Sequence, residues 1–397
     1  MATTARGMIE NFLYLVEKFG HIPNGGRIYY ERRSQPPLLT LMVESYLKHT
    51  NDTAFLRDKI HLLEAEYQFW QKQRAVNVTI AGKEYLLNRY NVQVGEPRPE
   101  SYSADVELAE GLDEDAQQNL WAELQSAAES GWDFSSRWFL PGPPPLPATR
   151  QDTQTSMVVS VDLNAFLCRV EQVLASLYRT LGNTEKANQF QAAHEYRVAA
   201  VQAVLWNDKA GVWLDYNLVR QRHNEAFYPS NLTPLWAECI TEPAAAERAL
   251  RYLEESSALS YTNGIPTSLA RTGEQWDLPN AWAPLQYVVI AGLAKSSSPW
   301  ARDLAFTLAQ NWVRTNLAVY EKYHAMFEKY DVEGDGNPGF GGEYEVQEGF
   351  GWTNGVIFQL LDFYGPTMRS SLHSSAARNR PFLSSLLHSS HFSFGRQ

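Results

Sequence analysis

Several acidic residues of the sequence lie beside aromatic and basic residues, in a pattern suited to breaking a glycosidic bond. That reaction usually takes two carboxyl groups, one protonated beside the leaving oxygen and one ionised to activate water or attack carbon. Asp133 suits the first role, because Trp132, Phe134 and Trp138 can shield it from water and raise its pKa. The alternative for Asp133 is to cap a helical turn that starts in Asp-Phe-Ser-Ser.

The second carboxylate cannot be selected from the residues alone, because seven acidic side chains lie in one Gly-rich region. These are Glu328, Asp331, Glu333, Asp335, Glu343, Glu345 and Glu348. Without further information we would prefer Glu343. The alternative for Glu328 is a surface position at the end of a helix, paired with Lys329 or with nothing.

The segment QWDLPNAWAP at 275–284 has the composition of a sugar-binding turn. Sugars present C–H faces that stack on aromatic rings, such as that of Trp276, and hydroxyls that need fixed polar partners. The alternative is a proline-bounded turn whose tryptophans belong to the core. Similar clusters recur at 131–138 (GWDFSSRW), 98–102 (RPESY) and 341–354 (GGEYEVQEGFGWTN).

Together with IPNGGRIYYERRSQPP at 22–37, these motifs resemble the trehalase family of glycoside hydrolases, in order, over nearly all of residues 5–364. The resemblance implies that Asp133 is the general acid and that Glu328, in the segment EKYD, is the general base. Singly, the 24–26 segment could be a turn and 34–37 the packed start of a helix. With Trp276 from the sugar-binding turn, the expected substrate contacts are Asn24, Arg33, Gln35, Arg98, Glu100, the backbone of Gly131, Glu343 and Trp276.

The implied reaction is hydrolysis of the α,α-1,1 bond of trehalose with inversion, which gives one α- and one β-glucose. Inversion requires the two carboxyls to lie roughly 6.5 to 9.5 Å apart, so that water fits between them. Several buried arginines are expected to keep Glu328 ionised and to leave Asp133 as the neutral carboxyl. The resemblance implies no metal or organic cofactor.

One acidic segment, DVEGDG at 331–336, imitates the start of a calcium-binding EF-hand loop. It departs from that pattern at the third position, Glu333, and at the twelfth, Gly342. The nine histidines show no HExxH spacing. We therefore expect neither a calcium nor a zinc site, and interpret the segment as a flexible active-site loop.

Composition favours a globular chain with a neutral small-molecule substrate. The 397 residues are 44% hydrophobic, and the net charge of -11 with a pI near 5.4 argues against a nucleic-acid partner. No apolar run approaches the about 18 residues of a membrane span, and no signal peptide opens the chain. Oligomeric state is not indicated.

Two cysteines and three glycosylation sequons bear on the environment of the chain. Cys168 and Cys239 are too few for a disulfide scaffold or a thiolate zinc site; we predict two buried free thiols without a catalytic role, with one disulfide as the alternative. The sequons at Asn51, Asn77 and Asn231 all lie in polar surroundings, where a glycan is expected to fit.

The elements that must position these residues are predominantly helices. The clearest apolar stripe runs over 163–178 and predicts one buried helix face. Strand-like alternation is short and predicts small hairpins at 76–87, around Ala81-Gly82, and at 212–218. Further helices are predicted at 8–19, 38–47, 55–69, 120–128, 190–205, 244–253, 282–293 and 304–319.

Alternation of helices with polar loops predicts an all-α fold, an (α/α)6 toroid with small β-hairpin insertions and the site loops at one end. We assign 1–364 to an incomplete toroid domain and 365–397 to a disordered tail rich in Ser, His and Arg. The proline-rich segment at 141–147 is interpreted as a surface connection.

The chain lacks one motif of trehalases, PGGRFxExYxWDxY, which lies upstream of the IPNG segment. We therefore expect the first toroid helices to be absent and the apolar faces of later helices to be exposed. The family is secreted or anchored at the outer cell surface, whereas this chain shows neither a signal peptide nor an anchor signal. It resembles a shortened or alternatively spliced form.

Three functions follow from these considerations. The first is an inverting trehalase, and the second is a catalytically inactive form that retains at most partial sugar binding. The third and weakest is another helical-toroid glycosidase, such as a glucoamylase-like enzyme, which the match at 22–37 disfavours.

Overall fold

The structure is a computed structural model that describes residues 1–140, 148–334 and 336–368. The nine helical segments predicted from apolar periodicity all coincide with α-helices. The α-helices are α1 Ala2–Phe19, α2 Leu39–Thr50, α3 Thr53–Gln73, α4 Tyr102–Leu108, α5 Glu114–Ser130, α6 Val161–Thr180, α7 Thr184–Leu205, α8 Thr233–Ala237, α9 Pro243–Glu255, α10 Ala283–Ala294, α11 Pro299–Tyr323 and α12 Gly351–Tyr364.

Short 3-10 helices connect several of these elements. They are η1 Ile28–Tyr30, η2 Pro99–Ser101, η3 Ser136–Trp138, η4 Arg150–Asp152, η5 Thr155–Met157, η6 Pro229–Leu232 and η7 Ser257–Ser260. The predicted tail lies outside the described residues from 369 onward, as do the proline-rich segment at 141–147 and Asp335.

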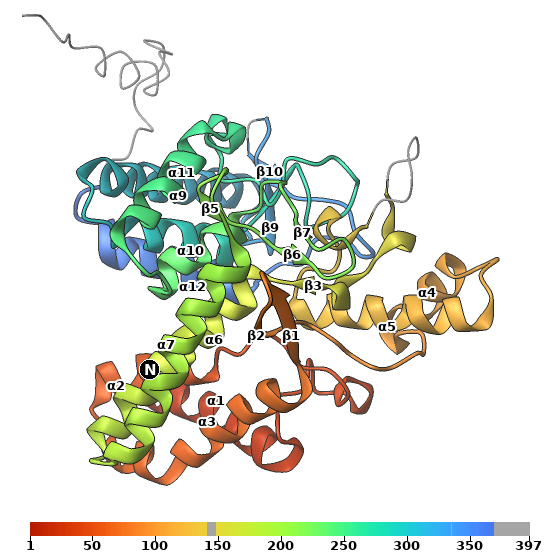
Figure 1. The fold of residues 1–397 in the computed structure, drawn as a ribbon. Coiled ribbons are helices and arrows are strands. Elements are labelled where there is room, and N and C mark those ends of the chain that lie inside the picture. The colour runs from red at the N-terminus through yellow and green to blue at the C-terminus, as the bar shows by residue number, and fades with distance from the viewer. Residues whose placement is uncertain (141–147, 335, 369–397) are drawn as a thin grey trace, which may run out of the picture.

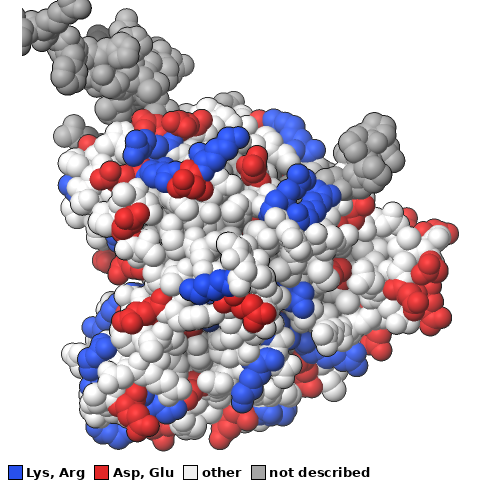
Figure 2. Space-filling model, in the orientation of Figure 1, with Lys and Arg blue, Asp and Glu red and all other residues white. Residues whose placement is uncertain are grey.

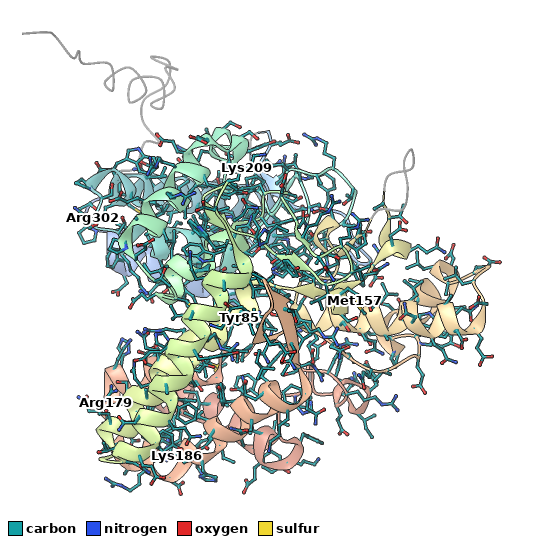
Figure 3. All side chains as sticks on the ribbon, in the orientation of Figure 1. Tyr85, Met157, Arg179, Lys186, Lys209 and Arg302 are labelled. Carbon is teal, nitrogen blue, oxygen red and sulfur yellow. A yellow bond between two sulfur atoms is a disulfide. The ribbon has the colours of Figure 1, made fainter. Side chains whose placement is uncertain are left out.

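The antiparallel pair α6 and α7 forms the centre of the molecule. Figure 1 shows the pair running between the N-terminal helices α1 to α3 and the C-terminal helices α8 to α12. Arg179 and Lys186 mark the end where α6 turns into α7, and Lys209 lies beyond the opposite end of α7 (Figure 3). The predicted apolar stripe of 163–178 is buried except for the partly exposed Phe166, which confirms that face.

Because α6 is buried on more than one side, it contributes to both apolar cores of the protein. Leu163 and Leu167 pack with residues of α1 to α3 and α5. Ala165 and Cys168 pack with residues of α7 to α11. The two cores therefore share one rigid helix, which fixes the N-terminal and C-terminal groups of helices relative to each other.

Small antiparallel sheets join the helices. The strands are β1 Ala75–Ile80, β2 Lys83–Asn88, β3 Val158–Val159, β4 Trp206–Asn207, β5 Val212–Trp213, β6 Tyr216–Asn217, β7 Arg222–His223, β8 Asn280–Trp282, β9 Lys329–Asp331 and β10 Asn337–Pro338. The predicted hairpin at 76–87 is confirmed, with Ala81 and Gly82 both at positive φ, as a two-residue β-hairpin turn requires. Residues 212–218 form β5, which pairs with β4, and β6, which pairs with β3 and β7.

The sheet β10-β9-β8 matters most for the site. Its register sets Trp282 opposite Lys329 and Asn280 opposite Asp331. This pairing brings the tryptophan-rich turn at 275–284 against the EKYD segment, although about 50 residues of chain separate them.

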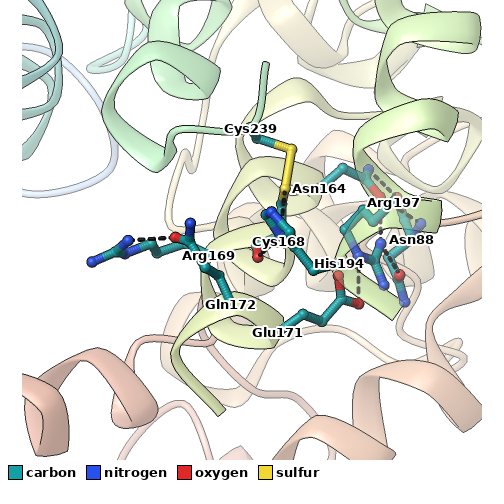
Figure 4. Close-up of a disulfide and its surroundings, with 9 residues drawn as sticks. All are labelled: Asn88, Asn164, Cys168, Arg169, Glu171, Gln172, His194, Arg197 and Cys239. Atoms are coloured by element: carbon teal, nitrogen blue, oxygen red, sulfur yellow. Dashed lines mark hydrogen bonds and ion pairs between the residues drawn. A yellow bond between two sulfur atoms is a disulfide. The ribbon is translucent and has the colours of Figure 1, made fainter. Parts of the chain in front are cut away.

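The prediction of free thiols is wrong, because Cys168 and Cys239 form a disulfide (Figure 4). Packing of α6 against α8 brings the two Cα atoms to 6.1 Å, a separation that a disulfide spans. Both cysteines are buried, and the His194 ring nitrogen Nδ1 lies 2.9 Å from the Cys168 carbonyl oxygen. The bridge therefore links the central helix pair to the C-terminal helices.

One of the three sequons also differs from expectation. Asn51 and Asn77 are exposed, but Asn231 is 1% exposed, and its amide nitrogen lies 3.3 Å from both the Ala226 carbonyl and the Tyr252 hydroxyl. The prediction that a glycan fits at all three sites is wrong for Asn231, because the 3-10 helix η6 packs it beneath α10.

The surface carries mixed charge. On the face shown in Figure 2, Lys and Arg are interspersed with Asp and Glu, and acidic side chains gather at the far end of α4 and α5. Apolar side chains are exposed on α12, including Phe358 and Phe363. Within the described ranges, no helix is both long and apolar enough to cross a bilayer.

Candidate active site

Asp133 lies in the loop that leads from α5 into η3. The helix ends at Gly131, whose positive φ of 76° turns the chain sharply. Ser135, not Asp133, caps η3, so the capping alternative for Asp133 is wrong. The Asp133 side chain is partly exposed, and burial raises its pKa to about 6, against the opposing effects of Arg98 and Arg33.

Glu328 directly precedes β9 and is fully buried, as is Lys329. The Lys329 Nζ atom donates to Glu328 Oε1 at 3.1 Å, and the Tyr344 hydroxyl lies 3.4 Å from Oε2. The surface alternative for Glu328 is therefore wrong, although the suggested pairing with Lys329 is present. Buried arginines were expected around Glu328, but its ion pair in the described structure is with a lysine.

Gln275 connects these two carboxyl-bearing segments. Its Nε2 group donates to the main-chain carbonyl of Asp133, and its Oε1 atom accepts from Lys329 Nζ at 2.8 Å. Lys329 in turn holds Glu328. The acid and base candidates therefore converge through one amide and one ammonium, although they are 195 positions apart in the sequence.

Asp277 fastens the same two loops together and is structural. It is fully buried and accepts hydrogen bonds from the hydroxyls of Ser135, Ser136, Ser268 and Thr272, and from the Ser136 N–H. Burial raises its pKa, which these donors oppose. With its oxygens occupied by neighbouring donors, Asp277 is a poor candidate for proton transfer.

Trp276 lies inside an indole stack. Its ring is parallel to that of Trp282 at 3.9 Å and stacks on Trp132 at 5.3 Å. Both faces of Trp276 are therefore covered, which favours the core alternative for this ring over direct sugar stacking. Its Nε1–H is buried and has no partner in the described structure, so it remains able to donate a hydrogen bond.

Three predicted substrate contacts meet around Arg33. The guanidinium donates to Asn24 Oδ1 at 2.6 Å, to Gln125 Oε1 at 2.8 Å and to the Glu100 carboxylate. Arg33 is buried, whereas Glu100 is exposed and Asn24 partly exposed. The arrangement fixes the guanidinium at the rim of the site.

Gln35 and Gly131 also lie together. A Cβ atom on Gly131 would lie 3.2 Å from Gln35 Oε1, and Gln35 Nε2 donates to the Ala128 carbonyl at 3.0 Å. The absence of a side chain at Gly131 therefore leaves room for Gln35 next to Asp133.

The remaining pair, Arg98 and Glu343, is joined by a residue that the sequence analysis missed. Arg98 and Arg150 donate to the same Glu343 oxygen at 2.8 and 2.7 Å. Both guanidiniums lie over the Phe134 ring, at 4.8 and 4.7 Å from its centroid. The pKa of Glu343 is lowered, mainly by the charge of Arg98, with Arg150 adding to the effect, although burial opposes it.

Three site residues, Arg150, Gln275 and Lys329, were not among the predicted contacts. Gln275 and Lys329 lie inside the sugar-binding turn and the EKYD segment, so their positions in these motifs could have identified them as site residues. Arg150 follows the proline-rich segment, and no pattern in the neighbouring sequence marks it as a site residue. A separate cavity of about 410 Å³ is lined by residues such as Arg89, Glu123 and Ser156 and by none of the candidate catalytic residues.

Comparison with known proteins identifies relatives over most of the chain. The family model Trehalase matches residues 1–365. The human trehalase is 57% identical over 93% of this chain and 63% of its own length, and the trehalase of Apis mellifera is 46% identical over 92% and 59%. The chain thus spans less than two thirds of the length of these relatives.

Solved structures show the same fold. The neutral trehalase Nth1 from Saccharomyces cerevisiae matches with a TM-score of 0.68 at 22% identity, covering 93% of this chain and 68% of that one. A GH63 mannosylglycerate hydrolase from Thermus thermophilus, in complex with Tris and D-glycerate, matches at 0.58 and 16% identity, over 88% and 87%. The predicted all-α toroid class is confirmed.

Proposed function

The chain belongs to the trehalase family, and from that premise we propose that it hydrolyses α,α-trehalose to two glucose molecules with inversion. The observation that carries the proposal is the convergence of Asp133 and Glu328 through Gln275 and Lys329. Two carboxyls in different environments are what acid and base roles require.

Asp133 is the general acid. With a pKa raised to about 6, it holds its proton at mildly acidic pH and transfers it to the bridging oxygen as the C–O bond breaks. Asp133 is partly exposed, unlike its neighbours Trp132 and Phe134.

Glu328 is the general base. It removes a proton from the water that attacks the anomeric carbon, and so the departing glucose leaves as the α anomer while the attacked one becomes β. The Lys329 ammonium, 3.1 Å from Oε1, is the cation with which this buried carboxyl group pairs.

The polar groups that surround the two carboxyls hold the sugar hydroxyls. Arg33, with Asn24 and Glu100, and Arg98, with Glu343, form two fixed arrays of donors and acceptors. Gln35 contributes beside the open backbone of Gly131. A neutral disaccharide suits such arrays, since each hydroxyl both donates and accepts.

The test is incubation of the purified chain with trehalose, with the product anomers followed by proton NMR at early times. Inversion predicts equal α- and β-glucose, whereas retention gives α alone. Asp133→Asn and Glu328→Gln should each lose activity, and Glu345→Gln, at an exposed acidic position of the same region, should retain it.

Two outcomes would contradict the proposal. Absence of glucose, when a longer relative is active in the same assay, would favour the inactive form. Faster release from maltose than from trehalose would favour the glucoamylase-like alternative.

A further inference from the structure

The side chain of Lys329 is fully buried next to the proposed base, yet the reaction as described assigns it no transfer of atoms or protons. Its Nζ atom has two hydrogen-bond acceptors in the described structure, Glu328 Oε1 at 3.1 Å and Gln275 Oε1 at 2.8 Å. Aromatic rings flank it, because the centroids of Trp282 and Tyr344 each lie 5.1 Å from Nζ. A buried ammonium is costly unless it is paired, so its partners constrain it tightly.

We propose that Lys329 is a positioning residue that keeps Glu328 ionised and correctly oriented, and that it links this base to the loop of the acid Asp133. The inference rests on the proposed function, since it concerns how the same two carboxyls are arranged for hydrolysis.

The first step of the argument concerns Glu328. Lys329 occupies Oε1 of the carboxylate, so that Oε2 faces the Tyr344 hydroxyl at 3.4 Å. The two oxygens therefore differ: Oε1 accepts from an ammonium at 3.1 Å, whereas Oε2 has only the longer contact of 3.4 Å with Tyr344 and is the oxygen that we assign to the attacking water. Tyr344 is exposed, whereas Glu328 itself is fully buried.

The second step concerns Gln275. An amide can bond in two orientations, and the Lys329 ammonium, which only donates, fixes Oε1 toward itself. Nε2 must then point to the Asp133 carbonyl, to which it donates. Lys329 thereby sets the orientation of the group that tethers the acid loop.

The third step concerns the backbone that carries the lysine. Lys329 lies within β9, opposite Trp282 of β8, and the ladder continues through Tyr330. The Cα position is therefore fixed by sheet hydrogen bonds, and the ring pair at Trp282 and Tyr344 fixes the end of the side chain.

Ionisable groups that face Glu328 are Lys329 from β9, Tyr344 from the 341–349 loop and Asp133 from the loop before η3. Lys329 is the cation of this group. The pKa of Lys329 is lowered by burial, although the negative charges of Glu328 and Asp133 oppose this effect. Loss of the ammonium would remove the positive charge 3.1 Å from Glu328 Oε1 and leave this buried carboxyl group without its cation.

The experiment compares Lys329→Met, Lys329→Gln and Lys329→Arg. Lys322→Met, at an exposed lysine in the last turn of α11, is the matched control. The acidic limb of kcat/KM for trehalose should move up by about one pH unit or more in Lys329→Met and Lys329→Gln. Activity at neutral pH should fall about 10- to 100-fold, and Lys329→Arg should restore the limb.

A second readout does not depend on activity. In protein labelled with 13C at the Glu carboxyls, the Glu328 signal, assigned with Glu328→Gln, should titrate at higher pH in Lys329→Met or Lys329→Gln. Lys329→Gln can still donate a hydrogen bond, so it serves if Lys329→Met does not fold. If the parent chain releases no glucose, the proposed function fails, and this titration still decides the role of Lys329.

Two results would overturn the inference. One is an unshifted acidic limb and an unshifted Glu328 titration in a folded, neutral Lys329 variant. The other is a loss of thermal stability that accounts for all loss of activity, with the remaining folded fraction showing the parent pH profile.

Discussion

The Arg98 guanidinium lies 2.8 Å from the Glu343 carboxylate, although 245 residues of chain separate them. Arg98 is buried, and it also holds Asp105 with two further side-chain hydrogen bonds, at 2.6 and 3.0 Å. The pair therefore anchors the late Gly-rich loop beside Phe134, the residue after the proposed acid.

Substitution of Arg98 should lower the stability of the fold more than substitution of Glu343. Arg98→Met leaves Asp105 buried without its cation, which should destabilise the fold by about 3 to 5 kcal/mol. Glu343→Gln leaves Arg98 paired with Asp105 and should cost about 1 kcal/mol. Thermal or urea unfolding of the two variants measures the difference, and similar losses would show that the Asp105 ion pair is not the dominant contact.

The raised pKa of Asp133 predicts the basic limb of the pH profile. A general acid must be protonated, so kcat/KM for trehalose should fall as pH rises through about 6. The positive charge of Arg33 lowers this pKa, and Arg33→Gln should therefore move the limb to higher pH. Arg32→Gln, which removes an exposed arginine paired with Glu96, is the control and should leave the limb in place. An unchanged limb in Arg33→Gln would argue against Asp133 as the titrating acid.

Glu66 of α3 should make the free energy of unfolding depend on pH. It is buried, and burial raises its pKa from 4.5 to about 8. Because the folded-state pKa is the higher one, stability is fully present below about 4.5 and declines as pH rises to about 8.

Glu66→Gln removes this titration. The variant should match the parent near pH 4.5 and exceed it at pH 7.5, by at most about 4 kcal/mol. Urea unfolding at the two pH values checks this, with the exposed Glu17→Gln as control. Equal differences at both pH values would contradict it.

The disulfide should contribute substantially to stability. Cys168 and Cys239 are 71 residues apart in sequence, and closing a loop of that length in the unfolded chain corresponds to about 4 kcal/mol. The double variant with Ala at both positions should lose about that amount. Alkylation in denaturant, read by mass spectrometry, should label neither cysteine before reduction and both after it; labelling without reductant would show free thiols.

The three sequons should differ in whether they carry a glycan. When the chain is expressed through a secretory pathway, Asn51 and Asn77 should carry glycans because their side chains reach solvent. Asn231 should remain unmodified, since a glycan on its amide nitrogen would displace the packing around Tyr252. Peptide mapping after glycosidase treatment shows which of the three asparagines carried a glycan. A modified Asn231 in folded protein would contradict the structure.

Local patterns predicted the helices well, because an amphipathic stripe depends only on neighbouring residues. The exceptions are the short helices α4 and α8, of 7 and 5 residues, and α12, whose sequence GWTNGVIFQLLDFY is apolar nearly all round and so lacks a clear period. The turn at Ala81-Gly82 was likewise predictable, because its positive φ angles favour Gly at the second position.

The site was less accessible from sequence. Asp133 could be selected by its aromatic neighbours, whereas Glu328 required the family resemblance. Lys329 and Arg150 act through contacts with segments far away in the chain, which no local pattern encodes. The disulfide was missed for the same reason, since it depends on how α6 approaches α8.

The long separations between partners in the site have a consequence for biosynthesis. Asn24, Asp133, Gln275 and Glu343 are spread over most of the chain, and the full set of their contacts cannot form until Glu343 has left the ribosome. The helices α1 to α3 can pack earlier, as a nascent chain. The proposed site can thus be complete only after the loop that carries Glu343 has been synthesised, and turnover of sugar would report that this late segment has joined the earlier ones.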